Sequence, residues 1–482
     1  INKSIYHNSF LSKFLTLISG SFLAYLLPTI SAPILTRIYS PEEFNLYAIY
    51  IAIIQLCAIS FTLKYELAIP LEKIAKKRIS LFTLSILNML FMIGLFFVFI
   101  KLFLISYPNN QLNHILNFLP LGIAFQTLFN HVIYHWLLFK KEFRLISSGK
   151  IIFASIYSFF PIIIFYTLDL KDYKYIIISH QIGLFLSIIT TSFILYNKNI
   201  FLVIKKFFKV KFSNLKSTFV DYKKYTLFST PSHLMNSLGI WLPAFFIWFF
   251  LDDKYVALFF ISHRMINAPV LLVGQSIGKI FYSEASESQL KGKLNVSIIK
   301  YFKLLFHTAL PFLFICIFLI DDIFSFIFND NWLEIGKIIK IFSPWLFLVF
   351  IASPLSTIPT ILYKQEYEFR FQFTLLIVRF FALSIGSFLG DIYFMFIIFS
   401  LANVIVWFFY LLIIFKISNI RIYEILNACV EDVLEHSIIF IIILLINIFF
   451  VNPAYTLIGS LLIVIYLFYS FYNKVIKSNF EI

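Results

Sequence analysis

Charged residues are scarce in this sequence. They make up 13% of its 482 residues, whereas soluble domains carry about 25%. Hydrophobic residues account for 61% of the chain and aromatic residues for 20%. A water-soluble core cannot take up this much apolar surface, because folded soluble chains of this length also need a polar exterior. The composition therefore excludes a soluble globular protein and predicts an all-α integral membrane protein.

Cysteine is also rare. The three cysteines, Cys57, Cys316 and Cys429, lie far apart, and the first two fall inside apolar runs. No spacing typical of a disulfide framework or of a metal site occurs. We therefore interpret the cysteines as small apolar packing residues, and we expect neither a metal ion nor a cofactor.

The apolar runs lack the alternation of barrel strands, which have a period of two over ~10 residues. A transmembrane helix needs ~20 mostly apolar residues. The first run has no small-residue cleavage site and leads into a second, so we expect no cleavable signal. With this length as the criterion, the sequence predicts fourteen transmembrane helices, which begin near Leu11, Phe44, Leu81, Leu112, Ser148, Tyr175, Tyr225, Tyr255, Tyr301, Ile338, Phe371, Ile392, Val433 and Tyr455.

Lysine and arginine segregate between the connections of these helices. If the N-terminus is inside, 30 of the 39 fall on the inner side and seven on the outer side. Because cytoplasmic loops are enriched in lysine and arginine, both termini are predicted to be cytoplasmic. The basic cytoplasmic loops then account for the net charge of +15, and we expect no nucleic-acid partner. The two remaining basic residues, Arg264 and Arg379, lie inside predicted spans.

A long basic connection, residues 197–224, separates the first six spans from the next six. The two halves resemble each other weakly: each begins with a long span that contains proline, followed by a short acidic turn, "SPEEF" or "LDDKY". We predict an N-terminal six-helix bundle over residues 1–222, a second over 223–420, and two additional helices over 421–482. The outer loops are too short to hold a catalytic domain, which needs about 50 residues.

The eighth predicted span carries a permanent charge. Arg264 costs ~2.5–3.5 kcal/mol at the centre of a membrane even on insertion scales, so it should face the protein interior or a wet cavity. At 3.6 residues per turn, further polar and small residues share its side of the helix. They are Asn267, Gly274, Gln275 and Gly278. A structural role, capping backbone carbonyls or pairing with Glu66, is the alternative to ligand binding.

Other polar residues also lie within the predicted spans. They are Arg379 in span eleven, Gln126, Asn130 and Tyr134 in span four with His131 and His135 beside them, His233 and Asn236 in span seven, and Lys64 and Glu66 at the inner end of span two. Arg379 could equally snorkel or pack against neighbouring helices. The histidines are more often satisfied hydrogen-bonding residues than ligands, and Lys64 could simply pair with Glu66.

No aspartate or glutamate lies near the middle of any predicted span. An exporter of cationic drugs needs such a carboxylate to hold the coupling ion and to pair with its substrate. The predicted interior is cationic instead, which indicates an anionic cargo. A guanidinium presents several donors that suit phosphate oxygens. An amphipathic phosphate ester therefore fits this interior.

Two stretches of the sequence are distinctive. The first is "SGSFLAYLLPTISAPILTRIYSPEEFNLYAIYIAI" followed by "KYELAIPL", and the second is "RMINAPVLLVGQSIGKIFYSEASE". Both resemble the bacterial O-antigen-type polysaccharide flippases, the second resembling the eighth span of that family. The superfamily also holds multidrug exporters and the peptidoglycan-precursor flippase. The family usually has Arg-Tyr-Glu where this chain has Lys64, Tyr65 and Glu66, so the positive charge is kept but the guanidinium is lost.

The resemblance implies two six-helix bundles related by a pseudo-two-fold axis around a central cavity. It also implies alternating access, in which the bundles rock so that the cavity opens first to the inside and then to the outside. It implies a transporter of the bacterial cytoplasmic (inner) membrane, not an enzyme. The cargo would be an undecaprenyl-diphosphate-type lipid-linked oligosaccharide, handed to a polymerase and a chain-length regulator. Arg264 and then Lys64 would bind its pyrophosphate, and Arg379 is added on its depth alone.

Three other functions stay open at this stage. A membrane polysaccharide polymerase is also polytopic and basic, but it needs a sizeable outer loop. A multidrug exporter of the same fold would need an intramembrane carboxylate. A peptidoglycan-precursor flippase shares the same physical requirements, and only the motifs of spans one and two separate it from the O-antigen type.

Overall fold

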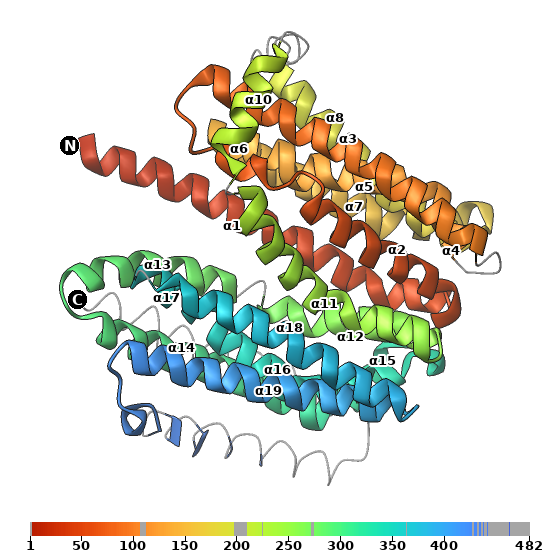
Figure 1. Cartoon of the computed structure of the whole chain (residues 1–482). Helices are drawn as coiled ribbons and strands as arrows, with labels where there is room; N and C mark the ends of the chain where they lie inside the picture. Colours follow the sequence, from red (N-terminus) through yellow and green to blue (C-terminus); the bar gives the residue numbers. More distant parts are fainter. Residues whose placement is uncertain are drawn as a thin grey trace. The chain divides into compact units, whose positions relative to one another are not determined.

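The computed structural model describes residues 2–106, 112–196, 210–223, 225–270, 274–362 and 364–426, and a few isolated positions beyond residue 426. The described residues form helices joined by short turns and contain no strand (Figure 1). The prediction of an all-α fold is therefore confirmed.

Eleven helical stretches within the described residues are long and apolar enough to cross a membrane. They correspond to the first seven predicted spans and to the ninth to twelfth. In the region of the eighth, α12 (Lys254–Pro269) and α13 (Gln275–Leu290) are described, whereas residues 271–273 lie outside the described residues. The thirteenth and fourteenth also lie almost wholly outside them. The chain is thus a multi-pass membrane protein, and the count of fourteen stays a prediction.

The chain divides into two compact units, Ile1–Phe245 and Phe246–Ile482. The division falls within α11 (Thr230–Phe250), whereas the boundary predicted from the sequence lies between residues 222 and 223. The assignment of six, six and two helices to three segments stays a prediction, since residues beyond 426 are mostly outside the described part of the chain.

In the first unit, α7 packs against both α1 and α8, while α2 packs against α5 and α8. The short α10 lies against α3. The elements of this unit are α1 (Asn2–Ile38), α2 (Pro41–Ser60), η1 (Tyr65–Ala68), α3 (Ala75–Ser106), α4 (Leu112–Ile115), η2 (Leu116–Phe118), α5 (Leu119–Thr127), η3 (Leu128–Ile133), α6 (Tyr134–Lys140), α7 (Phe143–Leu168), α8 (Tyr173–Tyr196), α10 (Phe212–Asp221), η4 (Tyr225–Ser229) and the first part of α11.

In the second unit, α16 occupies the centre, because α12, α13, α14 and α19 all pack against it (Figure 1). The helix α18 runs along α19. The elements of this unit after α12 and α13 are α14 (Leu294–Phe314), η6 (Ile315–Leu319), α15 (Ile320–Ile327), η7 (Asp330–Trp332), α16 (Glu334–Leu355), α17 (Ile358–Ile361), α18 (Gln365–Phe388) and α19 (Ile392–Ile417).

The acidic turn "SPEEF" starts α2. Ser40 is its N-cap and accepts a hydrogen bond from the backbone N–H of Glu43, while the Glu43 carboxylate accepts one from the Ser40 N–H at 2.8 Å. Pro41 occupies the first helical position, where its missing N–H costs nothing. This capping box satisfies two of the free N–H groups at the helix end. The acidic residues of this turn thus serve helix initiation.

Between Leu87 and Ile105, most of the exposed side chains of α3 are apolar. Phe91 is 65% exposed, Phe99 67% and Ile105 76%. Contiguous apolar patches of this extent are rare on soluble monomers, and they suit a helix that faces lipid. By contrast, most of α16 is buried inside its unit. The first unit therefore presents a surface suited to lipid along α3, and the second unit is packed around α16.

Candidate functional site

The connection between α2 and α3 is the least regular backbone in the first unit. Leu63 and Lys64 both have positive φ values, 53° and 59°, a conformation that non-glycine residues rarely adopt. The single turn η1 follows directly. Two consecutive residues in this region store strain that the surrounding packing must offset, and such strain concentrates at functional sites. We call residues 61–71 the site loop.

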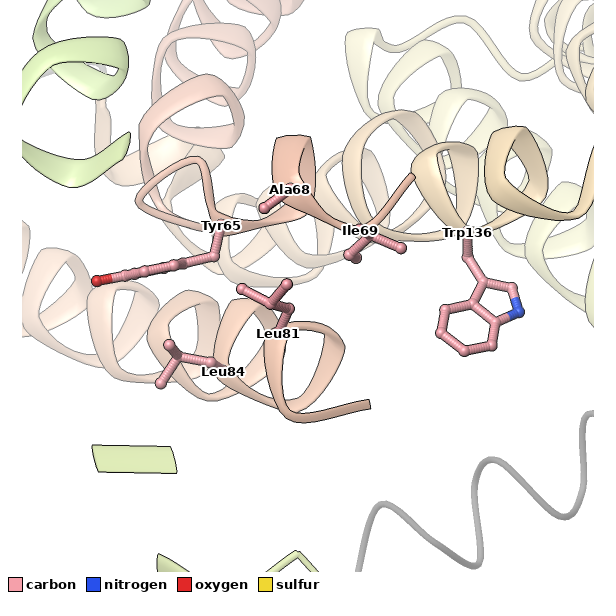
Figure 2. Close-up of a cluster of buried hydrophobic side chains, with 6 residues drawn as sticks. All are labelled: Tyr65, Ala68, Ile69, Leu81, Leu84 and Trp136. Atoms are coloured by element: carbon pink, nitrogen blue, oxygen red, sulfur yellow. The ribbon is translucent and has the colours of Figure 1, made fainter. Parts of the chain in front are cut away.

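Hydrophobic packing holds the site loop in place. Tyr65, Ala68 and Ile69 are buried in a cluster with Leu81 and Leu84 of α3 and Trp136 of α6. Figure 2 shows Ile69 and Leu81 between Tyr65 at one end of the cluster and Trp136 at the other. Lys64 and Glu66 flank Tyr65 in the sequence, and both are buried in the interior of the unit.

Lys64 and Glu66 form a buried charged pair. Lys64 is 3% exposed and Glu66 0%. The Lys64 Nζ lies 3.7 Å from Glu66 Oε1, and His131 Nδ1 lies 3.8 Å from the same oxygen. Burial lowers the pKa of Lys64 below its ordinary value, and the Glu66 carboxylate acts against this shift. A buried amine of this kind is a functional-site candidate.

His131 lies on a widened stretch of the fourth span. The segment η3 is a π-helical turn inserted between α5 and α6. Such single-turn π-bulges occur often at functional sites. The extra residue changes which side chains share a face after it. At this turn, His131 lies beside Lys64 and Glu66 of the site loop. One turn further on, the imidazole Nδ1 of His135 lies 2.6 Å from the backbone oxygen of His131.

The other residues predicted in spans four and seven take different places. Gln126 is buried, and its Oε1 accepts no hydrogen bond within the described part of the chain. Asn130 is half-buried, and His233 and Asn236 occupy exposed positions. His233 still lies close enough to Lys64 and His135 to interact with both electrostatically. The structure therefore joins His233 to the site loop, whereas Asn130 and Asn236 stay predicted ligands.

Two residues, His131 and Lys150, take part in the interior of the first unit in a way that the sequence did not predict. His131 was interpreted as a satisfied hydrogen-bonding residue, yet it faces the buried carboxylate of Glu66. Lys150 is one of the 30 basic residues that the predicted topology places in inner-side connections, yet it lies within α7, where its Nζ donates to Ser21 Oγ at 3.3 Å and lies 5.5 Å from the ring centroid of Tyr134. Its position inside an apolar run was the signal that could have identified it.

The helix α10, part of the long basic connection, docks on the site loop. The Tyr65 hydroxyl donates to the backbone oxygen of Phe219 at 3.4 Å. The Tyr222 hydroxyl donates to the Glu72 carboxylate, and Lys77 Nζ lies 2.8 Å from Asp221 Oδ2. The connection between the two predicted bundles therefore directly contacts the loop that carries Lys64 and Glu66.

In the second unit, α12 and α13 carry the polar stripe predicted around Arg264. Arg264 is half-buried, and the Asn267 amide donates to its own helix, at the backbone oxygen of His263. A Cβ at Gly278 would lie 3.4 Å from Pro354 of α16. The small-residue part of the stripe therefore serves helix packing. The side chain of Gln275 lies outside the described residues.

Arg379 is enclosed by the second unit. It is 5% exposed, and its Nε donates to Asn403 Oδ1 at 2.7 Å. Its guanidinium carbon lies 5.4 Å from the ring centroid of Trp345 and 5.8 Å from that of Phe399. These contacts satisfy the packing alternative given in the sequence analysis. A role as a ligand stays a prediction that no contact in this unit supports.

The chemistry available at the site loop is anion recognition and proton binding. It offers one buried amine, one buried carboxylate and three imidazoles. Among the described residues, no three His, Cys, Asp or Glu side chains are arranged to hold a metal ion.

Solved structures of several transporters share this fold. A lipid II flippase, MurJ, in an inward closed conformation matches with a TM-score of 0.70 at 16% identity, over 96% of this chain and 100% of that one. A MOP superfamily transporter from Pyrococcus furiosus matches with a TM-score of 0.55 at 14% identity, over 84% and 95%. A point mutant of the Vibrio cholerae MATE transporter VcmN matches with a TM-score of 0.53 at 13% identity, over 85% and 97%.

The chain is therefore a multi-pass membrane protein whose fold is the one seen in these solved transporter structures. Residues 34–337 match the family model described as polysaccharide biosynthesis protein. The chain belongs to that family, which confirms the resemblance found in the sequence. A comparison with curated protein sequences gave no match.

Proposed function

We propose that the protein is a flippase that moves polyprenyl-diphosphate-linked oligosaccharide units from the inner to the outer leaflet by alternating access. The units would be those of an O-antigen or a related surface polysaccharide. Membership of a polysaccharide biosynthesis family and a fold shared with a lipid II flippase support this class of cargo.

The observation that carries the proposal is the buried Lys64 of the site loop. An amine that is 3% exposed in an apolar unit costs free energy unless an anion pairs with it. Its neighbour Glu66 lies beyond hydrogen-bond distance, so the pairing is incomplete. A pyrophosphate supplies several strong acceptor oxygens on a compact group, and Arg264 stays a predicted contact for the same group.

The cellular setting follows from the same proposal. The protein would lie in the bacterial cytoplasmic membrane with both termini in the cytoplasm, as the distribution of basic residues predicts. An undecaprenyl-diphosphate-type carrier would present its headgroup to the interior while its chain stays in the bilayer. A polymerase and a chain-length regulator would then use the delivered units.

A multidrug exporter is the second candidate, because transporters of the MATE family share the fold. One observation favours it: Glu66 is a fully buried carboxylate. However, this carboxylate sits beside Lys64 and His131. A cationic drug would have to displace a neighbouring positive charge, so an anion is the better ligand.

The test is a deletion strain whose surface glycolipid is extracted and resolved by chain length. A flippase requires that surface polysaccharide be absent and that unpolymerised lipid-linked units accumulate on the inner leaflet. A single unit still attached at the surface would contradict the proposal, because units would then cross without this protein. Drug sensitivity of the same strain, with surface polysaccharide unchanged, would favour the exporter.

A further inference from the structure

The Glu66 carboxylate is shared between two basic groups and bound firmly by neither. Its Oε1 lies 3.7 Å from Lys64 Nζ and 3.8 Å from His131 Nδ1. Neither of its oxygens accepts a hydrogen bond from any residue that the structure describes. A buried carboxylate normally takes several short hydrogen bonds, because leaving it unsatisfied is costly. The position of Glu66 therefore suits a group that changes partner.

The titratable groups described around Lys64 and Glu66 come from four elements. Lys64 approaches from the site loop, His131 from η3, His135 from α6 and His233 from α11. We call these four residues and Glu66 the counterion cluster. Burial favours the neutral form of an imidazole, and a carboxylate close by favours its charged form. With no anion bound, Lys64 and Glu66 neutralise each other and the imidazoles need no proton.

An anionic headgroup would change this balance. Phosphate oxygens that pair with Lys64 take over the role that Glu66 holds in the structure. Glu66 would then be a second buried anion next to the headgroup, and like charges at short range disfavour the ionised form. His131 is already as near to the carboxylate as Lys64 is, so a proton bound between Glu66 and His131 removes the excess charge.

We propose that Glu66 is a displaceable counterion, which neutralises Lys64 in the empty transporter and binds a proton together with His131 when a diphosphate headgroup takes Lys64. The proton comes from water on the side where the site is open, and it leaves when the headgroup leaves. Because the two groups interact, the proton belongs to the pair as a unit. This inference rests on the proposed function and adds a proton to the substrate-bound state.

The test is a calorimetric titration of the purified full-length protein with farnesyl diphosphate, in two buffers of different ionisation heat at about pH 7. The difference between the buffers gives the protons taken up, and we expect about one per headgroup bound. In Glu66→Gln, we expect no proton uptake and binding tighter by roughly tenfold, since the competing charge is gone. Glu284→Gln, which alters a carboxylate paired with Lys300 in the second unit, is the control and should behave as wild type.

The outcomes separate the two proposals. If wild-type protein does not bind farnesyl diphosphate, diphosphate recognition fails, and the proposed function and this inference fail together. If it binds without proton uptake, the inference alone is wrong. Unchanged proton uptake in Glu66→Gln, or weaker binding by that variant, would likewise overturn the counterion role while the flippase function stands.

Discussion

The guanidinium of Arg379 donates a hydrogen bond from Nε to the Oδ1 of Asn403, 2.7 Å away. Asn403 is fully buried, and its own amide donates to the backbone oxygen of Phe399. Trp345 and Phe399 flank the guanidinium. Arg379 of α18 therefore contacts both α16 and α19. Its charge, although it lies at membrane depth, serves the packing of the second unit.

Removing the acceptor of this hydrogen bond should destabilise the second unit. In Asn403→Leu, the buried guanidinium loses its partner, at a cost of about 1.5–3 kcal/mol for a hydrogen bond to a charged group. Thermal unfolding of the detergent-solubilised protein, followed by size-exclusion chromatography, measures the loss. Arg379→Met, which removes the charge itself, should be less harmful. Wild-type stability in Asn403→Leu would contradict the packing role.

For Arg264, we expect substitution to impair transport and to leave folding and insertion intact. Arg264→Ala should abolish transport although the protein still inserts, because the variant lacks the predicted pyrophosphate contact. Arg264→Lys keeps the charge without the planar set of donors and should be partly active. Complementation of the deletion strain, with protein level measured in the same membranes, checks both. Full activity in Arg264→Ala at a normal protein level would refute the role.

Lys64 should bind the headgroup through its charge. We expect Lys64→Gln to weaken binding of farnesyl diphosphate roughly tenfold to hundredfold, equivalent to about 1.5–3 kcal/mol for a charge-assisted hydrogen bond. Lys64→Arg should retain part of the affinity. Lys101→Gln removes an exposed lysine at the far end of α3 and serves as the control. Equal loss in the control and in Lys64→Gln would show that only net charge matters.

The docking of α10 on the site loop depends on Tyr222. Tyr222→Phe removes the hydrogen bond to Glu72, and we expect a loss of about 1 kcal/mol of local stability. Trypsin should then cut faster at Lys216 and Lys223, which are exposed on either side of the docked face. Tyr166→Phe, at a tyrosine that is 72% exposed, should leave cleavage unchanged. The same cleavage rate in both variants would mean that this hydrogen bond does not hold α10.

Two helical glycines should respond in opposite ways to alanine. At Gly386, an added Cβ would lie 2.5 Å from the backbone of Met395, so Gly386→Ala should cost about 1–3 kcal/mol through overpacking. At Gly94, no atom lies within 4 Å, so Gly94→Ala should be neutral or stabilising by up to about 1 kcal/mol. Melting temperatures of the two variants test this pair. A stable Gly386→Ala would mean that α18 and α19 separate easily.

Features of this protein that depend on a local or additive physical signal could be predicted from its sequence. The apolar runs predicted the membrane class and the all-α fold, because each span satisfies its own backbone hydrogen bonds. The motif around Lys64 and Glu66 pointed to a loop that the structure shows to be strained and buried. The turn "SPEEF" was noticed for its charge, whereas the structure assigns it to the capping of α2.

The candidate site was predicted only in part, because depth along a helix does not reveal what a side chain faces. Arg264 and Arg379 look alike in sequence, both being single arginines inside spans. In the second unit, Arg379 is enclosed by aromatic rings and Asn403, whereas Arg264 is half-buried. His131 was underrated because the π-helical turn η3, which orients it, has no signature in the apolar pattern.

The sequence by itself determined that this chain crosses a membrane many times, because hydrophobicity adds up residue by residue and needs no partner. It also determined the family, because short motifs preserve the residues that a shared fold requires. Only the tertiary structure decided that Glu66 lies between Lys64 and His131. Those groups come from a loop and from a distant helix, and their electrostatic coupling depends on distance and burial, which the order of residues does not encode.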